Sequence, residues 1–203
     1  MKKRETEKSR KTKETNIKIK LNIDGSGEAK IDTGIGILDH MLELFAFHGL
    51  FDLEIAAEGD LKVDIHHTNE DIGIVLGQAF DEALGDKEGI KRSASASWPM
   101  EDVIANVTVD ISGRGFFKEI ERDAGVCAEV KDGEGYSFTY ANHFFESLAK
   151  KMGTNLNIRL ASKNPDLHTN LEPVFKALGK ALDEATQIDP RRKGIPSTKG
   201  VID

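Results

Sequence analysis

Apolar side chains recur at helical spacing in four stretches of this chain. Residues 37–49 (ILDHMLELFAFHG) and 140–153 (YANHFFESLAKKMG) have apolar residues three and four positions apart, and both end in glycine, which readily adopts the left-handed conformation of a helix C-cap. Longer amphipathic stretches begin at His66 and at His168. The pattern therefore predicts two helices in each half of the chain.

Other stretches alternate between apolar and polar residues, which is the period of a strand with one buried face. Residues 51–59 (FDLEIAAEG) and 154–162 (TNLNIRLAS) follow this pattern between the two helices of each half. Residues 15–34 predict two strands around a DGSG turn, and residues 101–120 predict the equivalent pair in the second half. Because strands and helices do not alternate strictly, we expect an α+β fold of two similar units, each packing a sheet under helices.

The two halves also repeat one another in sequence. The octapeptide LGQAFDEA at 76–83 returns as LGKALDEA at 178–185, with six of eight residues identical. The two octapeptides are 102 residues apart. Three further pairs match at a separation of 102 or 103 residues: His66 with His168, Glu70 with Glu172, and His40 with His143. An internal duplication explains these matches better than chance does. We expect the two halves, residues 1–95 and 96–203, to form one compact unit.

Composition and charge narrow the class of protein. With 203 residues, of which 38% are hydrophobic, the chain can bury a core. Its net charge of −7 argues against a protein held to nucleic acid by phosphate contacts. Residues 1–13 are locally basic but mix both signs, which indicates a solvated arm or an edge strand. Residues 189–203 lack periodicity, which indicates a loop or a disordered end.

Cysteine usage and the apolar runs bear on the compartment. The single cysteine, Cys127, has no partner for an internal disulfide, which is typical of a reducing environment, and we interpret it as a small apolar filler. No apolar run reaches the roughly 20 residues that span a bilayer, and no apolar segment follows the charged N-terminus. We therefore expect a cytoplasmic protein without membrane or nucleic-acid partners.

Adjacent histidines open the long helix of the first half. Neighbouring helical residues point about 100° apart, so His66 and His67 cannot easily converge on one ion, and each must serve a different site. Glu70 follows His66 by four residues and His67 by three, so its carboxylate shares a face with either ring. His168 and Glu172 repeat this spacing. Two imidazoles and a carboxylate suit manganese, iron or zinc better than calcium.

The alternative interpretation is that histidines at a helix start are solvated or act as caps. Five of the six histidines lie in the repeated segments, together with the matched glutamates, which favours metal binding. His48 is the exception, and its place at a helix end favours an interaction with the helix dipole.

Six sequence blocks, taken in order, resemble the imidazoleglycerol-phosphate dehydratase family. They are RKTKET (10–15), DTGIGILDHML (32–42), HHTNED (66–71), SGRG (112–115), FKAL (175–178) and PSTKG (196–200). The likeness covers nearly the whole chain. It implies a duplicated α+β fold of the ribosomal S5 domain 2-like type and two manganese ions per active site, with other divalent transition metals as alternatives. It also implies trimers that assemble into a 24-subunit shell with active sites at subunit boundaries.

The activity that the resemblance implies is that of a hydro-lyase in histidine biosynthesis. It would remove water from D-erythro-imidazole glycerol phosphate to give imidazole acetol phosphate. The proton to be removed lies on a carbon without a neighbouring carbonyl, so the imidazole ring of the substrate must take up the charge. Two metal ions at the ring nitrogens would favour an imidazolate that can expel the hydroxyl group. Neighbouring histidines that point in different directions would let one helix supply a ligand to each of the two metal ions.

The resemblance further implies roles for individual residues. The implied metal ligands are His40, His66, His67, Glu70, His143, His168 and Glu172. The implied acid–base group is Glu14, with Glu172 as a candidate partner. The implied phosphate-binding residues, which offer guanidinium, ammonium and hydroxyl donors, are Arg92, Arg114, Lys176, Ser197 and Lys199 in the second half and its tail.

The second copy departs from the family pattern at one ligand. Residues 168–172 read HTNLE, with Thr169 where the second histidine of the family motif stands, and Asp166 is a candidate replacement ligand. The chain could then work with a weaker or water-completed site, prefer a different metal, or be a noncatalytic paralogue whose histidine clusters only staple subunits together. An RNA-binding module, suggested by the S5-like fold, is disfavoured by the acidic charge.

Overall fold

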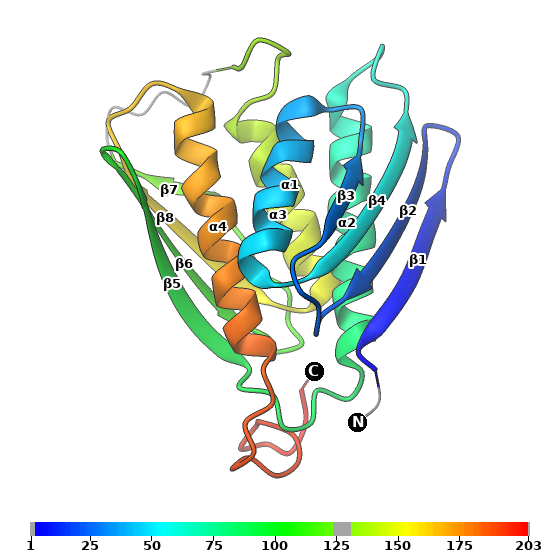
Figure 1. Ribbon diagram of the computed structural model, residues 1–203, viewed down its shortest axis with the longest axis vertical. Coiled ribbons are helices and arrows are strands. Elements are labelled where there is room, and N and C mark those ends of the chain that lie inside the picture. Colours follow the sequence, from blue (N-terminus) through cyan, green and yellow to red (C-terminus); the bar gives the residue numbers. More distant parts are fainter. Residues whose placement is uncertain (1–2, 124–130, 203) are drawn as a thin grey trace.

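Two four-stranded sheets flank four helices in the computed structural model, which describes residues 3–123 and 131–202 (Figure 1). The first sheet has the order β1-β2-β4-β3, with β1 (Glu5–Lys11), β2 (Thr15–Asn22), β3 (Ala29–Asp32) and β4 (Asp52–Gly59). The second has the order β5-β6-β8-β7, with β5 (Ser93–Met100), β6 (Val103–Asp110), β7 (Glu121–Arg122) and β8 (Asn155–Ala161). The helices are α1 (Gly36–Gly49), α2 (Ile65–Leu84), α3 (Phe138–Met152) and α4 (Leu167–Thr186). In each sheet the last pair is parallel and the other pairs are antiparallel.

The alternating sequence of the strands gives each sheet one apolar face. In β2, Ile17, Ile19 and Leu21 are buried while the residues between them face solvent, and β6 has the same alternation. The helices of each half contact the apolar face of their own sheet: α1 and α2 contact the first, and α3 and α4 the second. Each half is therefore a two-layer unit of sheet and helices, as the sequence predicts.

The two units join through their helices, because α1 packs on α4 and α2 packs on α3. The repeated octapeptide supplies the glycine at each crossing. A Cβ atom on Gly77 would lie 2.6 Å from the carbonyl oxygen of Leu148, and one on Gly179 would lie 2.5 Å from that of Phe45. Only glycine lets the helices approach so closely, which gives the repeat a physical reason.

All four helices begin at one end of the molecule, shown at the top of Figure 1, and end at the other. The C-terminal tail lies at the lower end, beyond α4. Over residues 189–202 it has no helix or strand, and a hydrogen bond of 2.9 Å from the Gly89 N–H to the Gly194 carbonyl oxygen holds it to the loop after α2. The molecule thus has a helix-start end and a tail end.

The structure confirms the α+β class and the internal duplication, but it corrects two strand pairings. Residues 15–34 do form two strands, β2 and β3, yet they do not pair with each other because β4 lies between them. Residues 101–120 contribute only β6, whose hairpin partner is the earlier β5.

Residues 5–11 form the edge strand β1, while Cys127 lies outside the described residues. Within the described part of the chain, no helix has the length and apolar character needed to cross a membrane.

Candidate metal centre

One cluster of possible metal ligands lies between α1 and α4. His40 comes from α1, and His168 and Glu172 come from the first turns of α4. Glu172 Oε2 lies 2.9 Å from His168 Nε2 and 3.5 Å from His40 Nε2, and the two rings stack with centroids 5.0 Å apart. One donor atom from each residue lies within 4.8 Å of the other two. We call this group the α1–α4 cluster.

Glu172 is held as a carboxylate in this cluster. Burial alone would raise its pKa, but the hydrogen bond from Lys176 and further bonds from His168 and His40 hold the pKa below its ordinary value. The cluster therefore offers two imidazoles and one anionic oxygen around a common point. This mixed nitrogen and oxygen set fits manganese, iron or zinc.

A second cluster lies between α2 and α3. His66 and Glu70 come from the start of α2, and His143 comes from α3. His66 Nε2 lies 2.9 Å from Glu70 Oε2, and the rings of His66 and His143 have centroids 4.4 Å apart. Among the described residues, His143 Nδ1 is buried without a hydrogen-bond partner. We call this group the α2–α3 cluster; its three residues border a pocket of about 330 Å³.

Each cluster takes one helix from each half of the chain. His40 of the first half joins the histidine–glutamate pair of the second half, and His143 of the second half joins the pair of the first half. The two clusters are related by the internal duplication, because α1–α4 packing and α2–α3 packing are equivalent. Both lie toward the helix-start end.

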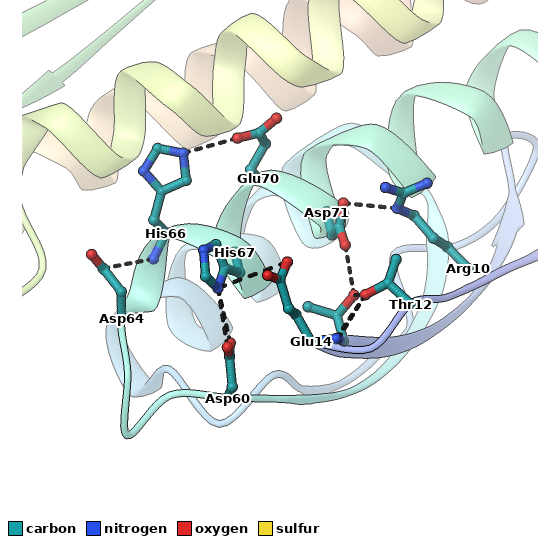
Figure 2. A network of polar contacts seen from close by, with 10 residues as sticks. Arg10, Thr12, Glu14, Asp60, Asp64, His66, His67, Glu70 and Asp71 are labelled. Carbon is teal, nitrogen blue, oxygen red and sulfur yellow. Dashed lines mark hydrogen bonds and ion pairs between the residues drawn. The ribbon is translucent and has the colours of Figure 1, made fainter.

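His67 belongs to neither cluster within the chain. Its ring diverges from that of His66, with centroids 6.2 Å apart, and its Nδ1 lies 3.1 Å from Asp60 Oδ2 and 4.0 Å from Glu14 Oε2 (Figure 2). The hydrogen bond to Asp60 raises the pKa of His67, and the Glu14 charge adds to this effect. Glu14 itself is largely exposed on the turn between β1 and β2. His67, Asp60 and Glu14 thus form a separate polar group beside the α2–α3 cluster.

Thr169 occupies the place in α4 that His67 occupies in α2. Its backbone N–H and its hydroxyl both donate to Asp166 Oδ2, each at 2.7 Å. Asp166 is the N-cap of α4, and these bonds lower its pKa, with the backbone bond having the larger effect. Oδ2 of Asp166 is therefore engaged by the cap, and the expectation that Asp166 replaces the absent histidine as a ligand stays a prediction.

The expected phosphate-binding residues separate into two places. Lys176 contacts Glu172 and so lies next to the α1–α4 cluster. Arg92 lies at the tail end, where its guanidinium donates to both oxygens of Asp110, at 2.6 and 3.0 Å, and to the carbonyl oxygen of Pro196, at 3.0 Å. This last bond brings Arg92 to the loop that carries Ser197 and Lys199, whose own contact is a 3.2 Å bond from the Lys199 N–H to Ser197 Oγ.

Arg114 also lies toward the tail end. Its neighbour Gly113 donates to the carbonyl oxygen of Gly153, which caps the C-terminal end of α3. From His168 to the end of α4 at Thr186 the helix rises about 27 Å, at about 1.5 Å per residue. A small ligand cannot bridge the α1–α4 cluster and the tail of the same chain, so the structure does not bring these expected site residues together within one chain.

Sequence reasoning missed three acidic residues that hold the expected ones. Asp60 binds His67, Asp110 binds Arg92, and Asp71 holds the turn that carries Glu14 through Thr15. Asp71 lies inside the HHTNED block, so a role for it could have been predicted from the sequence. Asp60 follows β4 and Asp110 is the last residue of β6, and neither lies in a motif, so only the folded contacts identify them.

Comparison with known proteins identifies the family. A profile described as imidazoleglycerol-phosphate dehydratase matches residues 33–182. The imidazoleglycerol-phosphate dehydratase of Geobacter metallireducens is 49% identical over 193 residues, covering 95% of this chain and 96% of that protein. That of a Thermoanaerobacter species is 50% identical over 199 residues, covering 98% of this chain and all of that protein.

Solved structures give the same result. The crystal structure of imidazoleglycerol-phosphate dehydratase from Staphylococcus aureus superposes with a TM-score of 0.76 and 33% identity, covering 91% of this chain and 99% of that one. The corresponding structure from Pyrococcus furiosus has a TM-score of 0.78 and 35% identity, covering 96% of this chain and 99% of that one. The chain belongs to the imidazoleglycerol-phosphate dehydratase family, whose members are hydro-lyases.

Proposed function

We propose that the chain removes water from D-erythro-imidazole glycerol phosphate to give imidazole acetol phosphate, as a metal-dependent step of histidine biosynthesis. Two findings support this: membership of the dehydratase family and the paired clusters at the helix-start end. The observation that carries the proposal is the α1–α4 cluster, because its two imidazoles and one carboxylate converge on a single point. The noncatalytic alternative is not favoured by the comparisons.

The metal that these residues would hold is proposed to be manganese, with two ions per active site. His40, His168 and Glu172 would hold one ion, and His66, Glu70 and His143 would hold the other, with His67 as an additional imidazole. When bound, the ions would act as Lewis acids and as a template for the imidazole ring of the substrate. Lys176 keeps Glu172 charged and so keeps the donor set ready for a cation.

Glu14 is proposed as the acid–base group that moves the carbon-bound proton. Its carboxylate is exposed, so a ligand can reach it, and the ring of His67 lies on one side of it. Its turn is held by neighbouring strands, since Asp60 N–H donates to the Glu14 carbonyl oxygen at 3.1 Å. Glu172 can serve as a partner only while its carboxylate is not engaged by the cluster.

The active site is proposed to be shared between subunits of a 24-subunit shell built from trimers. The separation of the two sets of site residues supports this, because Arg92, Ser197 and Lys199 lie at the tail end while both clusters lie toward the helix-start end. The tail of one subunit would then supply the phosphate site for the clusters of another. Arg114 would join this group, and Lys176 would contact the substrate from the cluster side. The two halves, 1–95 and 96–203, are proposed to act as one unit, in the cytoplasm.

A Glu14→Gln variant tests the proposed chemistry. It preserves the shape of the side chain and removes its capacity to accept a proton, so the rate of dehydration should fall by about a hundredfold or more. Assembly size and metal content should not change. Glu7→Gln, on the exposed face of β1, is the control and should keep the full rate.

Two results would contradict the proposal in different ways. Full activity of Glu14→Gln would remove the acid–base assignment. Absence of any dehydration by the wild-type protein in excess manganese would favour the noncatalytic paralogue.

A further inference from the structure

A buried carboxylate anchors the turn that carries Glu14. Asp71 lies on α2 four residues after His67, so both side chains occupy the same face of the helix. Asp71 is buried, and its two oxygens have separate partners. Arg10 Nε donates to Oδ1 at 2.8 Å (Figure 2), and the Thr15 hydroxyl donates to Oδ2 at 2.6 Å. The helix that presents His67 to Glu14 therefore also holds the strand next to Glu14.

Two hydroxyl groups extend this anchor to the backbone of Glu14. Because the Thr15 hydroxyl donates to Asp71, its oxygen is able to accept from the Thr12 hydroxyl, 3.1 Å away. Thr12 Oγ1 in turn accepts the backbone N–H of Glu14 at 3.0 Å and that of Thr15 at 2.9 Å. The turn is thus fixed to α2 by a continuous series of satisfied hydrogen bonds.

The second half of the chain shows that the fold does not need this network. β6 has the burial pattern of β2, and its first residue, Val103, stands where Thr15 stands in β2. In α4, Pro173 stands where Asp71 stands in α2, as the octapeptide repeat places them. Val103 and Pro173 are both apolar and buried. The same architecture therefore forms with apolar residues at both positions.

Burying a carboxylate has a cost even when it is paired. A polar network in one half and apolar residues in the equivalent half point to a role outside folding. The polar network occurs in the half in which Glu14 lies beside His67. The other half, with apolar residues in place of the network, has Thr169 in place of His67.

We propose that Asp71 is a positioning residue for Glu14, acting through Thr15 and Thr12, and that this network sets the place of the Glu14 carboxylate relative to His67. The proposal rests on the proposed acid–base role of Glu14. A misplacement of about 1 Å in such a group can cost about a hundredfold in rate, so the turn requires a fixed anchor.

The test is a double-mutant cycle on dehydration by the full assembly with manganese. Asp71→Ala would leave Arg10 and Thr15 without their partner and could prevent folding, so the network is cut at Thr15 instead. Thr15→Val introduces the residue that the second half carries at this position. We expect kcat to fall about tenfold, with KM and metal content within twofold of the wild type.

Thr15→Ser keeps the hydroxyl and should restore most of the rate. In the Glu14→Gln background, Thr15→Val should lower kcat by less than twofold, because the group being positioned is already gone. Thr108→Val is the matched control: it removes a cross-strand hydroxyl contact of 2.9 Å with Ser95 in the second half and should leave kcat unchanged.

Three results would overturn the inference. If the effects of Glu14→Gln and Thr15→Val multiply, the network supports the structure and not Glu14. If Glu14→Gln is slow while Thr15→Val has the wild-type kcat, the positioning role alone fails and the proposed function stands. If Glu14→Gln keeps the full rate, the acid–base assignment fails and this inference fails with it.

Discussion

The starts of α2 and α4 are near copies that differ at one functional position. Each helix has an aspartate as its N-cap, Asp64 or Asp166, and a histidine–glutamate pair bonded at 2.9 Å over one turn. The next position is His67 in α2, which reaches out toward Glu14, and Thr169 in α4, which turns back to its own cap. The difference teaches that the helix start and the histidine–glutamate contact need only the shared residues, while the neighbouring position is free to diverge.

This divergence makes the two halves unequal in the candidate metal ligands that they offer. Within the chain, each cluster has two imidazoles and one carboxylate. The first half offers one more imidazole, His67, and the second half offers a hydroxyl that is already bonded to Asp166. If a neighbouring subunit completes each site with the residue at this position, one site gains a strong ligand and the other does not.

Loss of a shared ligand should have the largest effect. His168→Ala and His66→Ala each remove an imidazole from one cluster, and each should cost one metal equivalent per chain and lower the dehydration rate by more than about a hundredfold. Metal analysis of the purified protein and a rate assay check both variants. His48→Ala, outside both clusters, should keep the full metal content.

A different metal content in His168→Ala and His66→Ala would show that the two clusters are not both metal sites. If one of the two variants keeps both equivalents of metal, the cluster that it alters is not a metal site.

Thr169→His should remove the inequality between the halves. In the wild-type protein we expect two classes of metal affinity, separated by at least about tenfold, since one site lacks an imidazole. The variant supplies that imidazole and should merge the two classes. Calorimetric titration of the metal-free assembly with manganese measures both affinities. Thr169→Val should bind metal as the wild type does, because the hydroxyl is occupied by Asp166; a single class of sites in the wild type would contradict the prediction.

Sequence periodicity predicted the helices well because apolar spacing is a local signal. The expected glycine cap is confirmed for α3, where Gly153 is left-handed, but it is wrong for α1, where Gly49 is still helical and Leu50 adopts the left-handed conformation. It missed β5, whose sequence SASASWPM has only partly buried residues on its inward face, two of which are the small Ala94 and Ala96. It also placed β2 and β3 as neighbours, whereas β3 pairs in parallel with β4 after α1 crosses over. Such a crossover depends on packing between distant elements and leaves no local signal.

The candidate site follows the same division between local and distant information. The pairs His66–Glu70 and His168–Glu172 could be predicted from their spacing of four residues. The internal repeat and the family resemblance added His40 and His143 to the candidate ligands, yet spacing could not show that each joins the pair of the opposite half. That arrangement follows from α1–α4 and α2–α3 packing.

The smallest expected effect concerns another pair of equivalent positions, Asp52 and Asn155, at the starts of β4 and β8. Asp52 Oδ1 accepts a hydrogen bond from the backbone N–H of Ser26 at 2.7 Å. This bond is the main cause, and bonds from Asn22 and Glu28 are further causes, of a pKa of Asp52 below its ordinary value of 3.8. A lowered pKa in the folded state adds stability that is fully present above the unfolded pKa and is lost as the pH falls through the folded pKa. Asp52→Asn should therefore lower stability slightly at neutral pH and reduce its loss below about pH 4.

Urea unfolding of the metal-free protein at pH 7 and at about pH 3 measures this effect. The reverse change, Asn155→Asp, places a carboxylate at the equivalent strand position, where the residue opposite on the neighbouring strand is Asp110 and not the amide donor Asn22. It should therefore add no comparable dependence on pH. If Asp52→Asn and the wild type lose the same free energy of unfolding between the two pH values, the carboxylate does not stabilise the turn at residues 24–28, and the two halves are alike at this position despite their different side chains.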